Sequence, residues 1–164
     1  MEKPTESEAY EILEQLHIPY QRVDHAPITS VKNYVGQLPG PQVKNLLLKT
    51  KKKDHYFLVI LPDPKIVDLK ELAVELGTKR LSFASPEELD ELIGLPPGSV
   101  SPLAVHHDRE GKIQIIIDES IDREDTVGFH PNINTTTLII PFQEFERFLD
   151  WASHPPLYRK IASI

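Results

Sequence analysis

The sequence contains no cysteine. The chain therefore forms no disulfide, and it offers neither a thiolate nucleophile nor a thiolate ligand for a metal ion. It also lacks a glycine-rich phosphate-binding loop, a zinc-ligand set and a Ser-His-Asp signature. No apolar run approaches the ~20 residues that a membrane-spanning helix needs. These absences exclude several common enzyme classes and predict a protein with no membrane contact.

Basic residues are outnumbered by acidic ones, and the net charge is −7 at pH 7. This balance argues against broad coating of nucleic acid, which depends on neutralising phosphates with Lys and Arg. An acidic protein can still dock RNA through a small basic patch. Five lysines fall within ten residues: Lys44, Lys49, Lys51, Lys52 and Lys53. Two interpretations stay open, namely a patch that docks RNA and a hairpin tip kept soluble by charge.

The length and apolar content predict one globular domain over residues 1–164. A chain of 164 residues with 40% hydrophobic residues is long enough to build a real core. The first residues are polar and contain no apolar core of a secretion signal. We therefore expect a cytoplasmic protein.

Hydrophobic periodicity and turn residues predict an α+β (mixed α/β) domain. We expect helices at about 5–16, 29–37, 68–77, 85–94 and 141–152. We expect strands at 20–23, 43–50, 56–61, 80–83, 103–107, 112–118, 125–129 and 135–140. The pairs 43–50 with 56–61 and 103–107 with 112–118 are predicted hairpins, so the sheet should be curved, largely antiparallel and flanked by helices.

Lys44 is a candidate site residue because it stands at the head of a strand that is expected to be otherwise buried. Its ammonium must reach solvent, an anion or a cavity, since an unpaired buried charge is costly. A lysine extending to water from the strand end is the plain structural alternative. Strand alternation places Asn45 on the opposite face from Lys44.

Two further candidate segments lie in predicted loops. The first, residues 98–102, follows two prolines, and its Gly98 can adopt a positive φ that lets the backbone approach a ligand. The hydroxyls of Ser99 and Ser101 add polar groups, but this motif taken alone favours the plain alternative, an ordinary rigid loop between helix and strand. The second is His130, which precedes a proline and is biased towards extended backbone. It suits a pocket wall, an acid/base group or a turn residue.

The other histidines are not expected to form a metal site. His106 and His107 are adjacent in a predicted strand, so their side chains should face opposite sides. An acidic cluster has irregular spacing typical of a solvated loop; it comprises Asp118, Glu119, Asp122, Glu124 and Asp125. No metal or other cofactor is predicted.

Taken together, three motifs resemble the YbaK/PrdX family of aminoacyl-tRNA editing domains, and the PrdX branch in particular. They are the Lys-Asn-Leu run at 44–48, the Pro-Gly-Ser-Val-Ser-Pro loop at 97–102 and His-Pro-Asn-x-Asn-Thr at 130–135. The resemblance covers residues 43–149. It implies the fold of the synthetase-associated editing domain, free-standing and similar to the insertion domain of bacterial prolyl-tRNA synthetase.

The resemblance implies a deacylase that hydrolyses mischarged Ala-tRNA(Pro), without a cofactor and with the terminal ribose of the tRNA assisting the water. It implies Lys44 as the essential lysine of the site. It implies substrate-binding roles for Asn45, Gly98, Ser99, Val100, Ser101 and His130. The implied partners are the acceptor end of aminoacylated tRNA and, transiently, a tRNA synthetase.

Two departures from the family pattern bear on these roles. Thr136 replaces a common alanine and would change the pocket size if it lines the site, and Pro141 replaces a common helix cap. Other readings stay open: a deacylase for serine, threonine or cysteine, a non-catalytic tRNA-binding module, and an unrelated small-molecule binder.

Overall fold

The computed structural model describes residues 3–27, 41–52 and 55–164. Its helices are α1 (Glu6–Gln15), α2 (Leu69–Glu75), α3 (Pro86–Ile93), the 3₁₀ helix η2 (Pro102–His107) and α4 (Phe142–Trp151). Its strands are β1 (Gln21–Asp24), β2 (Val43–Thr50), β3 (Tyr56–Pro62), β4 (Leu81–Phe83), β5 (Ile113–Asp118), β6 (Thr126–Phe129), β7 (Thr136–Pro141) and β8 (Leu157–Arg159). The predicted helix at 29–37 lies outside the described residues.

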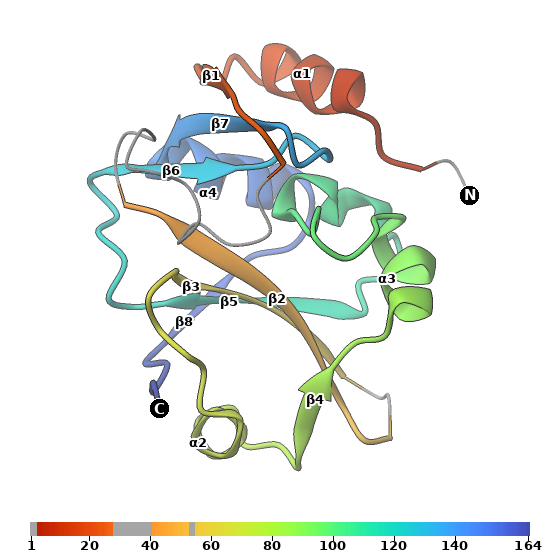
Figure 1. The fold of residues 1–164 in the computed structure, drawn as a ribbon, viewed down its shortest axis with the longest axis vertical. Coiled ribbons are helices and arrows are strands. Elements are labelled where there is room, and N and C mark those ends of the chain that lie inside the picture. The colour runs from red at the N-terminus through yellow and green to blue at the C-terminus, as the bar shows by residue number, and fades with distance from the viewer. Residues whose placement is uncertain (1–2, 28–40, 53–54) are drawn as a thin grey trace.

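The strands form two sheets rather than the single sheet expected. One has the order β4-β2-β3-β5-β8 and the other the order β1-β7-β6. The pairs β3–β5 and β5–β8 are parallel, and the remaining four pairs are antiparallel. Figure 1 shows that the three-stranded sheet lies near α1. Helix α2 lies at the opposite end of the molecule. The α+β class and the largely antiparallel pairing are confirmed.

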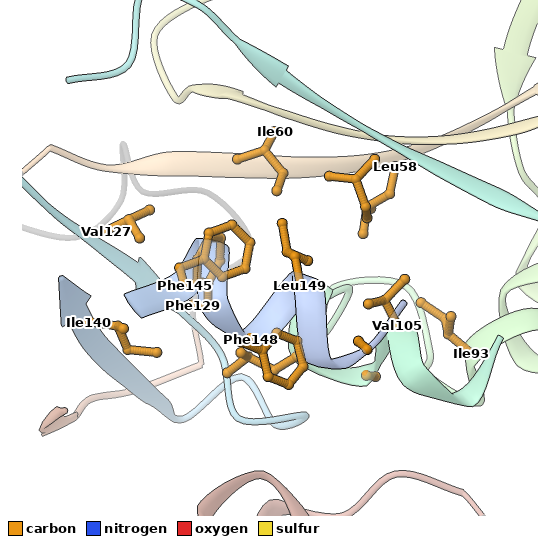
Figure 2. Packing of buried hydrophobic residues seen from close by; sticks show 14 of the residues in the cluster. Leu58, Ile60, Ile93, Val105, Val127, Phe129, Ile140, Phe145, Phe148 and Leu149 are labelled. Carbon is orange, nitrogen blue, oxygen red and sulfur yellow. The ribbon is translucent and has the colours of Figure 1, made fainter. Parts of the chain in front are cut away.

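Strand β3 divides the core because its side chains alternate between two faces. Leu58 and Ile60 belong to the larger hydrophobic cluster, which also contains the apolar side of α4. Figure 2 shows these two side chains facing Phe145, Phe148 and Leu149 of α4. The intervening β3 residues pack instead in a second, smaller cluster that includes residues of α2. Both faces of the five-stranded sheet are therefore covered.

Capping side chains fix the starts of α3 and α1. Ser85 caps α3, its hydroxyl accepts the N–H of Glu88, and the Glu88 carboxylate accepts the N–H of Ser85 in return. Gly94 ends this helix in the left-handed conformation, with φ of 69°. Thr5 caps α1, but the Glu8 carboxylate is turned towards two histidines instead.

One predicted hairpin is wrong. Residues 103–107 are not a strand; they lie in η2, which begins after Ser101 accepts the N–H of Leu103. This cap and the proline at the first helical position favour a helical turn over extended backbone. Strand β5 consequently pairs in parallel with β3. The sequence reading also missed β8.

None of the helices in the described ranges has the length and apolar character needed to cross a bilayer.

Candidate functional site

The loop at 98–101 and the turn at His130 are joined by a hydrogen bond. The Ser101 hydroxyl donates to the carbonyl oxygen of His130 at 2.6 Å and accepts the N–H of Leu103 at 3.1 Å. Ser101 is completely buried. Two segments that the sequence marked separately, 29 residues apart, therefore meet at one place.

The ring of His130 is held in a defined orientation. Its Nδ1 lies 3.1 Å from the carbonyl oxygen of Thr136, which can only accept, so Nδ1 carries the proton. Burial, and then the charge of nearby His25, lower the pKa of His130 below its usual 6.5. The ring is consequently neutral at pH 7, and its Nε2 is an acceptor.

His25 is a neighbour of His130 that the sequence did not single out. Its ring centroid lies 6.1 Å from that of His130, and its Nε2 lies 2.8 Å from the Thr137 hydroxyl. The pairing of β1 with β7 brings it there, with Asp24 opposite Thr136. No local pattern identifies this contact, because it depends on strands more than 100 residues apart in the sequence.

The backbone of the loop has the features expected of a ligand-facing turn. Gly98 has a φ of 89° and is exposed, so a side chain there would be strained by backbone conformation alone. Ser99 is nearly buried, and its N–H donates to the carbonyl of Pro96. Within the described residues, the N–H of Val100 donates to no acceptor. It is therefore available to an oxygen of a ligand.

Lys44 and Asn45 lie on opposite faces of β2, as alternation predicts. Asn45 shares its face with Val43 and Leu47 of the larger cluster, whereas Lys44 shares its face with Leu48 of the smaller one. Within the described residues, the buried Oδ1 of Asn45 has no hydrogen-bond partner. Lys44 is half-buried and forms no ion pair there, nor a hydrogen bond to the 98–101 loop or to His130.

Gly128 of β6 stands where this strand closely approaches the side chains of its neighbour β7, the central strand of the small sheet. A Cβ at this position would lie 2.9 Å from Cγ2 of Thr137 and 3.2 Å from Cδ1 of Ile139. Because both atoms belong to a neighbouring strand, a larger residue would displace β7. Sequence reading did not single out Gly128.

Thr136 is tied to β1 rather than free. It is buried, and its hydroxyl donates to Asp24 Oδ1 at 2.8 Å. Its carbonyl oxygen also accepts a hydrogen bond from Nδ1–H of His130. The substitution of alanine by threonine therefore adds a cross-strand hydrogen bond at the same residue whose carbonyl orients His130.

The predicted lysine cluster is split by an ion pair. Lys49 lies 2.5 Å from the buried carboxylate of Glu88, which also accepts the hydroxyl proton of Tyr56. Lys51 and Lys52 remain exposed, and Lys53 lies outside the described residues. A cavity of about 910 Å³ is lined by Thr50, Lys51, Lys52, His55, Gly77, Thr78, Lys79 and Arg80. We call this the basic pocket; it has no carboxylate among these lining residues.

The expected separation of His106 and His107 is wrong. Because η2 is helical, both rings direct Nε2 towards Oε1 of Glu8, at 3.0 and 2.6 Å. Of the histidine and carboxylate groups in the described ranges, these three are the set close enough to share a metal ion. In the acidic loop, by contrast, Asp118 pairs with Lys65 at 2.7 Å.

The model of the aminoacyl-tRNA editing domain family matches residues 25–148. The prolyl-tRNA editing protein ProX of Acetoanaerobium sticklandii is 29% identical over 84% of this chain and 85% of its own length. A prolyl-tRNA synthetase associated domain-containing protein of Xenopus laevis is 34% identical over 88% and 90%, respectively. A multifunctional Ser/Thr-tRNA deacylase of Escherichia coli K12 is 29% identical over 72% and 70%.

The fold is also that of known structures. A crystal structure assigned provisionally as a trans-editing enzyme for prolyl-tRNA synthetase superposes with a TM-score of 0.68 at 20% identity, covering 98% of this chain and 99% of that one. Another, of a protein without an assigned function, gives a TM-score of 0.72 at 17% identity, covering 93% and 97%.

Proposed function

The chain belongs to the aminoacyl-tRNA editing domain family, and we propose that it is a hydrolase that removes alanine from mischarged Ala-tRNA(Pro). Relatives that match most of its length are named for prolyl-tRNA editing or for association with prolyl-tRNA synthetase. These names support tRNA(Pro) as the tRNA of the substrate. Prolyl-tRNA synthetase cannot strongly reject an amino acid that fits inside its own pocket. A second site that admits alanine and excludes proline would remove the error.

The hydrogen bond between Ser101 and His130 is the observation that carries this proposal. It fixes the free N–H of Val100 and the neutral ring of His130 relative to each other. When no protein nucleophile is used, ester hydrolysis requires a fixed hydrogen-bond donor for the developing oxyanion and a pocket wall that orients the substrate. Ser101 itself is fully buried and satisfied within the protein, so we assign it to positioning.

In the proposed reaction, a water oxygen bonds to the aminoacyl carbonyl carbon and the ester C–O bond breaks. The products are free alanine and the terminal ribose with its hydroxyl restored. The vicinal ribose hydroxyl of the tRNA assists the water, and the N–H of Val100 donates to the developing oxyanion. The neutral ring of His130, with Gly98 and Ser99, shapes the space around the aminoacyl group.

Lys44 is assigned to holding the terminal nucleotide electrostatically. Its ammonium has no ion-pair partner within the described residues, so a phosphate or ribose can engage it without breaking a bond. The buried Oδ1 of Asn45, on the other face of β2, has no hydrogen-bond partner within the described residues and can accept a hydrogen bond from a ligand group.

The basic pocket is the proposed contact for the acceptor end of the tRNA. It gathers Lys51, Lys52, Lys79 and Arg80 around one concavity, whereas the chain as a whole carries a charge of −7. Local positive potential of this kind attracts a polyanion despite the net charge. The proposal also includes a transient complex of this protein with a tRNA synthetase and a location of the protein in the cytoplasm.

A second candidate substrate is favoured by one relative. The Escherichia coli protein named as a Ser/Thr-tRNA deacylase matches 72% of this chain. Thr136, bonded to Asp24, adds a polar side chain close to His130, which is compatible with a hydroxylated amino acid. Cysteine and a non-catalytic tRNA-binding role are the remaining alternatives.

Deacylation assays with separately charged tRNAs test the proposal. Wild type and Lys44→Ala are incubated with Ala-tRNA(Pro), Pro-tRNA(Pro), Cys-tRNA(Pro), Ser-tRNA and Thr-tRNA. We expect rapid loss of alanine alone, slowed about 100-fold in the variant. Loss of serine, threonine or cysteine would retain the hydrolase and replace the substrate. Binding of tRNA without hydrolysis of any ester would overturn the enzyme and favour the binding module.

A further inference from the structure

Three potential metal ligands converge between α1 and η2, and none of them belongs to the loop at 98–101 or to the turn at His130. The Nε2 atoms of His106 and His107 lie 3.0 and 2.6 Å from the same oxygen of Glu8. All three ligand atoms lie within 4.8 Å of one another. We propose that Glu8, His106 and His107 bind one divalent transition-metal ion.

The spacing suits such an ion with little rearrangement. Metal–nitrogen and metal–oxygen bonds of about 2.0–2.2 Å place ligand atoms about 3.0 Å apart in octahedral geometry and about 3.4 Å apart in tetrahedral geometry. The Glu8–His106 separation already has the octahedral value, and the Glu8–His107 separation must open by a few tenths of an ångström. The Glu8 side chain is about a quarter exposed and has room for this shift.

Metal binding uses the deprotonated forms of these side chains, a neutral imidazole and an ionised carboxylate, so the affinity for the ion should fall as the pH is lowered.

Aromatic packing fixes the ring of His106. The ring lies 5.5 Å from that of Trp151 and 6.2 Å from that of Phe148, which it meets edge to face at 89°. Ligands held by packing are preorganised, which lowers the cost of assembling the site. Two nitrogens with one carboxylate oxygen suit Zn²⁺, Co²⁺ or Ni²⁺ better than Mg²⁺ or Ca²⁺, which prefer oxygen.

An open coordination position is expected, because three protein ligands leave at least one place for water. His107 also lines a cavity of about 560 Å³ together with Glu91, Leu92, Asp108, Arg109, Glu110 and Lys112. The ion would cross-link the N-terminal helix to η2, the segment that directly follows Ser101. The bound ion would therefore stabilise the packing of α1 against η2, next to the loop at 98–101. This role does not depend on the proposed deacylation.

The chain offers a local reporter for this site. Trp151 is its single tryptophan, and its ring adjoins that of His106. Bound Co²⁺ quenches nearby indole fluorescence, whereas Zn²⁺ does not. Full-length protein, freed of purification tags and dialysed against chelator, is titrated with Co²⁺ and then with Zn²⁺. We expect saturable quenching at one ion per chain and recovery of the fluorescence when Zn²⁺ displaces Co²⁺.

Variants assign the quenching to these ligands. His107→Gln and Glu8→Gln should weaken Co²⁺ binding by at least about 100-fold, because even changes outside the first ligand shell cost about 10- to 100-fold in affinity. The matched control is His17→Asn, an exposed histidine at φ 55° that asparagine tolerates. Thermal melts without metal verify that each variant folds, and Zn²⁺ should raise the Tm of wild type and of the control only.

Absence of saturable quenching in wild type would overturn the proposal. So would equal quenching in folded His107→Gln, since the ion would then bind elsewhere. A Zn²⁺-induced rise in Tm that persists in Glu8→Gln and His107→Gln would also count against it.

Discussion

The hydroxyl of Ser101 donates a 2.6 Å hydrogen bond to the carbonyl oxygen of His130 and also accepts the N–H of Leu103. One buried side chain therefore serves three segments: the glycine-containing loop, the turn before β7 and the start of η2. Ser101 is fully buried, so its hydroxyl is satisfied by these two backbone groups rather than by solvent.

We expect Ser101→Ala to destabilise the fold by about 1–3 kcal/mol, the cost of leaving buried polar groups unpaired. The proposed deacylation should also slow, because the N–H of Val100 loses its fixed position relative to His130. Urea unfolding and a deacylation time course measure the two effects. Ser120→Ala, at an exposed position, is the control. Unchanged stability in Ser101→Ala would contradict the role of this hydrogen bond.

Substitution of Lys44 should separate function from stability. We expect Lys44→Ala to reduce deacylation by about 100-fold, a loss typical of removing one group that stabilises the transition state. Its Tm should stay within about 1 °C of wild type, because the half-buried side chain has no ion pair to lose within the described residues. Circular dichroism melts and single-turnover kinetics are the measurements.

Lys49→Ala is the informative comparison, because Lys49 lies on the same strand as Lys44 but forms an ion pair with Glu88. It should lower the Tm. If Lys44→Ala lowered the Tm as strongly as Lys49→Ala, Lys44 would be structural, and the strand-end interpretation would be preferred.

The sequence predicted those parts of the fold that depend on local signals. Ser85, Pro86 and Gly94 bracket α3 because an N-cap, a first-turn proline and a left-handed glycine act within a few residues. The apolar run of β2 and its partner β3 follow from hydrophobicity and one short turn. The same local reasoning failed at 103–107, where Ser101 and Pro102 start a 3₁₀ helix within an apolar stretch.

The site was predictable only in part, for a related reason. Single motifs supplied Lys44, the loop at 98–101 and His130, but not their arrangement. The proximity of His25 depends on the pairing of β1 with β7, and the convergence of His106 and His107 on Glu8 depends on the helical geometry of η2 and its packing on α1. Such long-range contacts have no signature in a short sequence window.

Glu88 predicts a loss of stability in acid. Burial disfavours its charged form, but hydrogen bonds from Lys49, Ser85 and Tyr56 outweigh burial and lower the pKa from 4.5 to about 2. A folded-state pKa below that of the unfolded chain means that the unfolded chain binds the proton first as the pH falls. The stabilisation is therefore complete above about pH 4.5 and is lost progressively towards pH 2.

We expect the free energy of unfolding of Glu88→Gln to be lower than that of wild type at pH 7 and to change less between pH 4.5 and pH 2. Urea unfolding at several pH values measures the slope. Glu75→Gln, an exposed residue of α2, serves as the control. Equal slopes in wild type and Glu88→Gln would show that other carboxylates dominate acid unfolding.

The basic pocket predicts a salt-dependent contact with tRNA. We expect Lys52→Gln combined with Arg80→Gln to weaken tRNA binding and to reduce the slope of log K against log salt by about 1–2, since each phosphate contact contributes about 0.7–0.9. Fluorescence anisotropy at several salt concentrations gives this slope. Lys160→Gln, an exposed lysine outside the pocket lining, should leave it unchanged. An unaltered slope in the double variant would exclude the pocket from the tRNA interface.

The neutral ring of His130 makes a prediction about the pH dependence of the rate. Because burial and His25 lower its pKa, His130 does not change protonation between pH 7 and pH 8, and any transition lies below its usual value of 6.5. If it shapes the pocket, deacylation should be nearly flat from about pH 6 to 8 after correction for spontaneous ester hydrolysis. Asparagine can retain the hydrogen bond to the Thr136 carbonyl, so His130→Asn should keep more activity than His130→Ala.

The same group contributes to stability with a definite sign. Its folded-state pKa is lower than that of the unfolded chain, so the unfolded chain takes up the proton first as the pH falls below about 6.5. Wild type should therefore lose stability from pH 6.5 towards the lowered pKa, and His130→Asn should lose less over that interval. A rate that falls through pH 6.5 in wild type, with the inflection absent from His130→Asn, would instead identify His130 as an acid/base group in the reaction.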